Sequence, residues 1–293
     1  MTTSASVAEA YRHCRKITLR FAKTFYFASV FLPACKRNAC YAVYAFCRYI
    51  DDLVDTNTAS GSRVDAAAIS RTISQWQERL DRVYAGELVD DAVMVAWADT
   101  LRRYNISRAL PDELIDGVMT DLRSSVRFDT FEELRDYCYK VASVVGLMTS
   151  EIFGYNEPDA LEHAVDLGIA MQLTNILRDI GEDYANDRIY IPREELERFG
   201  LGERTIASRQ VCDGFRNLMD FQIARAHAYY ERANLGIAML DRDSRLTVTL
   251  MSHNYRRILT EIEHNGYDVY SSRASVPLHR KLMTIPTLWY AVR

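Results

Sequence analysis

The chain has 293 residues, and its 36 Lys and Arg against 40 Asp and Glu give a formal net charge of −4. It has no basic tail or Lys/Arg block, which argues against a nucleic-acid-binding protein. Only 12 glycines and 6 prolines interrupt it, too few to close many short strands, so we expect an all-α protein of long helices.

The cysteines and the N-terminus bear on the cellular compartment. The 6 cysteines form no Cys-x-x-Cys pair and no Cys/His cluster with zinc-site spacing, which favours reduced thiols in a core. Residues 1–7 are short and polar, unlike a targeting peptide, and no apolar run approaches the ~20 residues that span a bilayer. We therefore expect a cytoplasmic protein, at most peripheral to a membrane.

Apolar residues recur at helical spacing through most of the chain. The first part predicts helices over residues 7–22 and 37–54, with Pro33 between them, and a polar loop over 56–65. The later predicted helices span residues 65–85, 90–104, 111–125, 130–153, 158–184, 208–239 and 241–266.

Particular residues mark where helices begin and where they pack. Thr130 and Glu133 have the spacing of a capping box at a helix start. Gly146 and Gly168 lie inside helical patterns, where glycine costs about 1 kcal/mol, so we expect both to permit close helix packing. No linker divides the chain, and we expect a single domain over residues 1–293 with roughly ten helices.

A first acidic cluster lies in the second of these predicted helices. Tyr44, Arg48, Asp51, Asp52 and Asp55 follow one another at spacings that place them on one stripe of a helix. Three carboxylates so close together repel one another, and the partial negative charge of a helix C-terminus adds to the cost. A bound cation would remove that cost.

A second cluster shows a similar pattern. Gln172, Asn175, Asp179 and Asp183 share one helix face, and Arg178 lies on the neighbouring stripe. The amide and carboxylate oxygens of this face are the kind of ligand that a hard cation takes.

Either cluster alone is also compatible with an ordinary solvated helix face and surface salt bridges. Both, however, repeat Asp-x-x-x-Asp with an arginine one turn or one residue upstream. Magnesium is usually held by a few carboxylates together with substrate phosphates. Two such helices facing each other would hold Mg²⁺ and a diphosphate, and arginines would complete the clamp. The metal would neutralise the leaving diphosphate and let a carbon–oxygen bond ionise.

The segments CRYIDDLVD and QLTNILRDIGEDYANDRIYIP resemble the two signature regions of the squalene/phytoene synthase family. The similarity continues in AKTFYFAS, in YCYKVASVVG and in HNYRRILTEIEHNGYDV, so it spans nearly the whole chain in the family's order. The resemblance implies an isoprenoid-synthase-like bundle of helices around a central cavity. The two aspartate motifs would lie on opposite walls of that cavity.

By position, the resemblance also implies roles for individual residues. The metal-binding positions would be Asp51, Asp55, Asn175, Asp179 and Asp183, of which the four aspartates are the expected catalytic residues. The substrate-binding positions would be Lys23, Thr24, Tyr44, Arg48, Tyr137, Gln172, Arg178, Tyr255 and Arg273. The expected cofactor is Mg²⁺, with Mn²⁺ as the alternative ion, and no nicotinamide is expected. Many relatives carry His-Ser where this chain has Phe21 and Ala22.

The implied activity is that of a prenyltransferase. The run RIYIPREELERFGL with DIGED is most similar to members that condense two geranylgeranyl diphosphates through prephytoene diphosphate to phytoene, the first step of carotenoid biosynthesis. The alternatives are synthesis of dehydrosqualene, presqualene diphosphate or squalene from two farnesyl diphosphates, and a non-catalytic helical subunit that binds prenyl chains. The intact acidic motifs argue against the non-catalytic alternative. Prenyl diphosphates are thus the expected partners, while peripheral membrane contact for product release and the oligomeric state stay open.

The length of the substrate depends on how the cavity is packed. Ser29 ends the AKTFYFAS segment, which the resemblance places on the cavity wall, and it shares a helix face with Phe25. A small side chain there would leave room for a twenty-carbon chain, whereas a bulky aromatic would shorten the cavity. We therefore predict geranylgeranyl diphosphate as the substrate.

Overall fold

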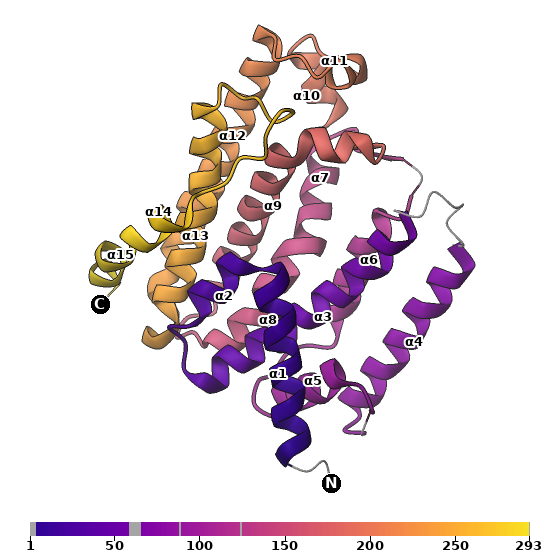
Figure 1. Ribbon diagram of the computed structural model, residues 1–293, viewed down its shortest axis with the longest axis vertical. Helices are drawn as coiled ribbons and strands as arrows, with labels where there is room; N and C mark the ends of the chain where they lie inside the picture. Colours follow the sequence, from indigo (N-terminus) through magenta and orange to yellow (C-terminus); the bar gives the residue numbers. More distant parts are fainter. Residues whose placement is uncertain (1–3, 59–65, 88, 124, 293) are drawn as a thin grey trace.

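The computed structural model describes residues 4–58, 66–87, 89–123 and 125–292, with side chains described in residues 7–52 and from residue 71 onward. The described residues form a bundle of helices (Figure 1). Their strand content is limited to one parallel pair of two-residue strands, β1 (Val126–Arg127) and β2 (Arg188–Ile189). The prediction of an all-α fold is confirmed.

The N-terminal helices begin and end within five residues of the predicted bounds, except a short helix over residues 23–29, for which no bounds were predicted. They are α1 (Ser4–Phe21), α2 (Lys23–Ser29), α3 (Ala34–Thr58), α4 (Ala66–Tyr84), α5 (Ala92–Leu101) and α6 (Ala109–Thr120). Asp91 caps α5 by accepting hydrogen bonds from the backbone amides of Val93 and Met94, at 2.9 and 3.0 Å. The loop predicted over residues 56–65 is shorter at its start because α3 continues to Thr58, and residues 59–65 lie outside the described part of the chain.

The single helix predicted over residues 130–153 is divided by a π-helical segment. It consists of α7 (Phe131–Cys138), the π-helix η1 (Tyr139–Ser143) and α8 (Val144–Phe153). The predicted capping box is present, since Thr130 Oγ1 accepts from the Glu133 amide at 3.3 Å and the Glu133 carboxylate accepts from the Thr130 amide at 3.4 Å.

The two helical glycines lie where backbones approach closely, as predicted. A Cβ atom at Gly168 would lie 2.4 Å from Ser143 Cα, so no side chain fits between α9 and the π-helix η1. A Cβ atom at Gly146 would lie 3.0 Å from the Ala164 carbonyl oxygen. α9, which carries the second acidic cluster, is thus held at backbone distance from η1 and α8.

The C-terminal half is dominated by three long helices and ends in two short ones. In chain order these are α9 (Ala160–Ala185), α10 (Arg193–Arg198), α11 (Glu203–Ser208), α12 (Asp213–Leu235), the 3₁₀-helix η2 (Gly236–Met239), α13 (Arg242–His264), α14 (Leu278–Met283) and α15 (Ile285–Ala291). The predicted helix over residues 208–239 begins later than expected. The sequence did not predict α14 and α15, each shorter than two turns, which lie beside α13 in Figure 1.

The buried apolar residues form two large clusters. One includes Phe46 and Trp97 and is built from the N-terminal helices with α8, and the other includes Phe215 and Tyr230 and is built around α9 and α12. Partly buried Leu167 packs against both clusters. A residue that packs against both clusters is expected in a single domain. That the whole chain forms one domain stays a prediction.

The thiols and the helices bear on the compartment prediction. Four of the six cysteines are buried, and all six are free thiols, which agrees with the expected reduced core. Among the described helices, none has the length and apolarity needed to cross a bilayer.

Candidate active site

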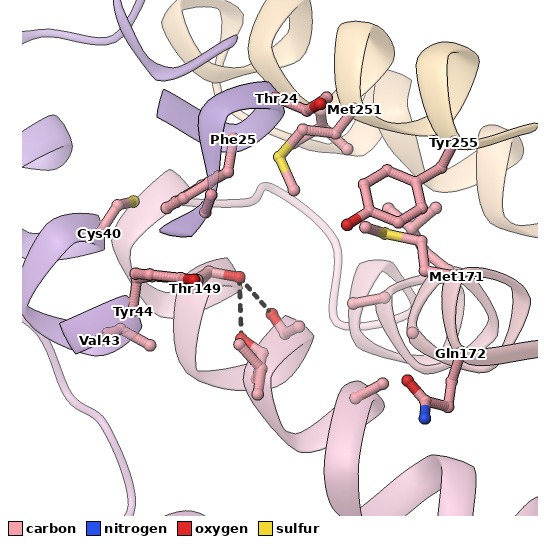
Figure 2. Close-up of a pocket in the computed structure, with 18 of the residues that line it drawn as sticks. Thr24, Phe25, Cys40, Val43, Tyr44, Thr149, Met171, Gln172, Met251 and Tyr255 are labelled. Carbon is pink, nitrogen blue, oxygen red and sulfur yellow. Dashed lines mark hydrogen bonds between the residues drawn. The ribbon is translucent and has the colours of Figure 1, made fainter. Parts of the chain in front are cut away.

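An elongated cavity of about 600 Å³ lies between α2, α3, α8, α9 and α13. Figure 2 shows Phe25, Tyr44, Met171, Met251 and Tyr255 directed towards it from these elements. Its wall follows α9 from Ala160 to Arg178, a distance on the order of 27 Å at 1.5 Å per residue. The cavity is therefore long and narrow, a shape suited to an extended chain.

The two ends of the cavity differ in chemistry. The polar end includes Arg20, Lys23, Tyr44, Gln172, Asn175, Arg178, Tyr255 and Arg273. The apolar end includes Val145, Phe153, Ala160, Ala164, Leu167, Ile237, Leu240 and Val248. The hydroxyl of Thr149, also on the wall, donates to the carbonyls of Val145 and Gly146 at 2.9 and 3.0 Å (Figure 2). Because that hydroxyl is satisfied within its own helix, it does not interrupt the apolar surface.

On the α9 side of the polar end, Asp179 is held by two arginines. It accepts hydrogen bonds from Arg178, the first with Nε at 2.8 Å, and from two nitrogens of Arg273 at 2.9 Å each. Burial acts to raise the pKa of Asp179, but the hydrogen bonds from Arg178 and Arg273 outweigh it and hold that pKa below its usual value. Asp179 is therefore ionised. Its hydrogen bonds with Arg273 connect the segment before α14 to α9.

Asp183 lies one turn further along α9 in a different environment. Burial, followed by the nearby charge of Asp179, raises the pKa of Asp183 to about 7, although Arg188 opposes the shift. Asn175, one turn before Asp179, donates from Nδ2 to the side-chain oxygen of Gln172 at 3.3 Å. This face of α9 thus presents closely spaced oxygen atoms. The carboxyl group of Asp183 is destabilised when it is ionised.

The α3 side carries the first acidic cluster. Arg48 pairs with Asp52, and its guanidinium lies 4.5 Å from the centre of the Phe21 ring. Phe21 therefore packs against this arginine. Asp51 is partly buried, and the side chain of Asp55 lies outside the described residues although its backbone belongs to α3.

α2 closes the polar end. Lys23 and Thr24, at its start, both line the cavity. The Thr24 hydroxyl accepts a hydrogen bond from Lys281 of α14 at 2.7 Å. The C-terminal segment thus reaches the polar end at two points, through Arg273 and through Lys281.

Three expectations about the cavity wall do not match the observed lining. Arg48 is not among the lining residues and pairs with Asp52. Tyr137 is buried and not among the lining residues, since its hydroxyl donates to Asp121 at 2.9 Å and its ring stacks on Tyr190. Ser29 is also buried behind the lining, where its hydroxyl contacts that of Tyr41 at 3.0 Å. Phe25, one turn earlier, is the member of this pair that faces the cavity.

A polar network next to Asp183 was missed at the sequence level. Asp121 accepts from the hydroxyls of Tyr137 and Tyr190, at 2.9 and 2.7 Å, and its carbonyl accepts from Arg188 at 3.1 Å. Tyr190 and Arg188 lie in the RIYIP run, which carried the resemblance without assigned roles. The network could have been found only by knowing that β1 and β2 pair and bring these residues together.

Among the described residues, no three acidic, histidine or cysteine side chains converge into a preassembled metal site. The side chains nevertheless fit Mg²⁺, because Asn175, Asp179 and Asp183 offer hard oxygen donors on one helix face. Burial and then the nearby charge of Asp179 raise the pKa of Asp183, and a bound cation would offset the cost of ionising this carboxyl group. In this structure, Arg178 and Arg273 supply the positive charge next to Asp179.

Comparison with known proteins agrees with this architecture. The family model for squalene/phytoene synthase matches residues 19–280. The chain is 42% identical to a 15-cis-phytoene synthase of Synechococcus elongatus over 96% of this chain and 93% of that protein. It is 43% identical to a 15-cis-phytoene synthase of a Synechocystis strain over 97% and 86%. A ligand-bound crystal structure of a dehydrosqualene synthase superposes with a TM-score of 0.89 at 29% identity, covering 98% of this chain and 97% of that one.

The match to the family model covers most of the chain and includes both acidic clusters, the π-helical segment and the whole of α13. This protein belongs to the squalene/phytoene synthase family.

Proposed function

We propose that the protein is a prenyltransferase that joins two molecules of geranylgeranyl diphosphate head to head to form phytoene. The observation that carries the proposal is the long cavity with one cationic, hydroxyl-rich end and one apolar end. An allylic diphosphate has the same two parts, a dianionic or trianionic head and a long apolar chain. The 15-cis-phytoene synthases that the chain resembles support the twenty-carbon substrate.

The cationic side chains of the polar end would bind the diphosphates. Arg178 and Arg273 line the cavity, and their fork-shaped guanidinium groups can form paired hydrogen bonds with phosphate oxygens. Lys23 contributes a third positive charge from α2, and the Tyr44 and Tyr255 hydroxyls contribute neutral donors. Positive charge that is fixed next to the leaving diphosphate lowers the activation free energy for its departure.

A divalent cation would complete this end of the cavity. Asp51, Asp55, Asn175, Asp179 and Asp183 are the residues proposed to hold Mg²⁺, with Mn²⁺ as the alternative. When bound, the cation supplies charge neutralisation for the departing diphosphate. The two acidic helices carry the proposed donors. Arg178 contacts Asp179 and lines the cavity, so it would lie between the cation and the substrate.

The apolar end would hold the prenyl chains and exclude water. The two substrates lose their diphosphates one after the other, and the cyclopropyl intermediate between these steps must stay bound. Val145, Leu167 and Ile237 present only hydrocarbon to an allylic cation, so water is kept from quenching it. The final step releases a proton, and no reductant is required for phytoene.

The test is the product formed from each substrate separately. Purified enzyme is given geranylgeranyl or farnesyl diphosphate with Mg²⁺, with and without a nicotinamide reductant, and then with excess EDTA. We expect phytoene from the longer substrate, no effect of the reductant, and no product in EDTA. Efficient use of farnesyl diphosphate alone would assign the chain to dehydrosqualene or presqualene diphosphate synthesis. Tight binding of either diphosphate without any product would indicate a non-catalytic prenyl-binding subunit.

A further inference from the structure

The apolar end of the cavity is bounded by residues from three parts of the chain. Cys40 of α3, Phe153 at the end of α8 and Leu240, which lies between η2 and α13, are buried and line the cavity. Figure 2 shows Cys40 on the cavity wall. We call these three residues the end wall. Because they belong to separate elements, the length of the cavity depends on how α3, α8 and the start of α13 are joined.

A lysine side chain joins these three parts of the chain next to the end wall. Lys36, one turn before Cys40 on α3, donates a hydrogen bond from Nζ to the Phe153 carbonyl oxygen at 2.7 Å. The same ammonium group donates to Asp241 at 3.0 Å and to Asp243 at 2.7 Å. We call Lys36, Asp241 and Asp243 the lysine clasp. It connects the start of α3 with the end of α8 and with the start of α13.

Backbone contacts bring the same segments together. The amide of Asp241, which directly follows Leu240, donates to the Gly154 carbonyl at 2.9 Å. Tyr155 and Leu240 form an isolated antiparallel bridge. Gly154 has a φ of 71°, and a Cβ atom there would lie 2.1 Å from the Asp241 carboxylate. The chain that leaves α8 therefore passes so close to the lysine clasp that only glycine fits.

The lysine clasp is stabilised by charge. The Lys36 side chain is 12% exposed, whereas the side chains of Asp241 and Asp243 are 45% and 44% exposed. An ammonium group that has lost most of its water needs acceptors for its N–H donors, and the carbonyl and the two carboxylates provide them. Because both carboxylates reach solvent, water can hydrate them when the ammonium is removed. A variant without the ammonium should therefore still fold.

We propose that Lys36 is a positioning residue that fixes the end wall and so limits the length of the prenyl chain that the cavity accepts. The proposal rests on the proposed function only in taking a prenyl diphosphate as the ligand. The lysine clasp holds the backbone of Phe153 and the residue that follows Leu240. A chain that extends past the end wall would have to separate these segments and break the contacts of the ammonium group. Lys36 does not line the cavity, so it acts through the end wall.

The test is equilibrium binding of unreactive analogues, in which sulfur replaces the oxygen that joins the prenyl chain to the diphosphate. The geranylgeranyl analogue and the longer geranylfarnesyl analogue are titrated by calorimetry in the presence of Mg²⁺. Lys36→Met keeps an unbranched apolar side chain but removes the ammonium group. We expect its affinity for the longer analogue, relative to the shorter one, to be about tenfold higher than in the unmodified protein.

A second variant and a control accompany this measurement. Asp243→Asn keeps the size of the side chain but weakens one ion pair of the clasp, and it should shift the affinity ratio about threefold in the same direction. Arg108→Met is the matched control. Arg108 is partly buried and pairs with the more exposed Asp81 and Asp112, and none of the three lines the cavity. Its affinity ratio should equal that of the unmodified protein.

Circular dichroism verifies the fold of each variant, and the Asp243→Asn ratio decides if Lys36→Met does not fold. An unchanged ratio in the folded clasp variants would overturn the proposal. An equal shift in Arg108→Met would also overturn it, because the cause would then be a general loosening of the bundle. Phytoene formation with an unchanged ratio would refute only the role of Lys36. A shifted ratio in a protein that forms no product would refute only the proposed activity.

Discussion

The two ends of the cavity are carried by the same helix, yet different features of the sequence determine them. From Gln172 to Asp183, α9 contributes side chains whose identity and spacing form a recognisable motif. From Ala160 to Met171 it contributes, apart from His163, small and apolar residues that also occur in many ordinary helices. The comparison teaches that a motif can specify the chemistry at a diphosphate, whereas the space available to the chain depends on packing between helices.

The largest expected effect comes from removing charge at the polar end. Asp179→Asn keeps the size of the side chain but removes the carboxylate that pairs with Arg178 and Arg273. Turnover should fall about a thousandfold, which corresponds to ~4 kcal/mol of transition-state free energy. Steady-state rates at saturating substrate and Mg²⁺ measure the effect.

Asp166→Asn is the matched control for this substitution. Asp166 also lies on α9 and also accepts two hydrogen bonds from one arginine, Arg232, but it lies away from the polar end. Its activity should stay within about threefold of normal. Similar losses in both variants would mean that ion pairing along α9, and not the site, explains the first result.

The next effect tests the apolar end. Ala164→Phe places a large ring on the cavity wall and should reduce turnover of geranylgeranyl diphosphate about tenfold to a hundredfold, while a shorter diphosphate is affected less. The ratio of kcat/KM values for the two substrates is the measurement. Ala164→Val should give a smaller change in the same direction. An unchanged ratio in both folded variants would place the end of the prenyl chain elsewhere.

A smaller effect is expected at the connection between the C-terminal segment and α9. Arg273→Gln removes a charged donor of two hydrogen bonds to Asp179 and a cation from the polar end. KM for the diphosphate should rise about tenfold, because a hydrogen bond to a charged group contributes about 1.5 kcal/mol or more. Arg232→Gln is the control, since Arg232 makes the same two-point contact with Asp166. A rise in KM in both variants would contradict a direct role for Arg273.

The smallest effect is expected at Ser29. Because its hydroxyl contacts Tyr41 behind the cavity lining, Ser29→Ala should leave the product unchanged and lower the free energy of unfolding by about 1 kcal/mol. Tyr41→Phe removes the same contact, so the losses of the two variants should not add in the double variant. A change of product length in Ser29→Ala would return this residue to the cavity wall.

The fold and the polar end were largely predictable from the sequence. Helical periodicity gave most helix positions, and the capping box at Thr130 was read correctly because both of its contacts are local. Gln172, Asn175 and Asp179 could be grouped from spacing alone, since a regular helix fixes which residues share a face. The helices α14 and α15 were missed because each is too short to show periodicity.

The remaining features depend on contacts between distant segments. Asp121 joins Tyr190 only because β1 pairs with β2, and Arg273 reaches Asp179 across 94 positions of sequence. The inward direction assigned to Ser29 was wrong for a related reason. Helix geometry correctly placed Ser29 and Phe25 on nearby faces, but only the packing against α3 decides which of them borders the cavity.

The contact at Gly168 has a consequence for how this sequence can change in length. Ser143 of the π-helix lies so close to Gly168 that α9 cannot slide or rotate at that point. The direction of each donor from Gln172 to Asp183 around the helix axis is therefore set by the number of residues that separate it from Gly168. Insertion of one residue between Gly168 and Gln172 would turn all of them by about 100° around the helix axis and away from the cavity. Insertions and deletions should therefore be excluded from this stretch of α9.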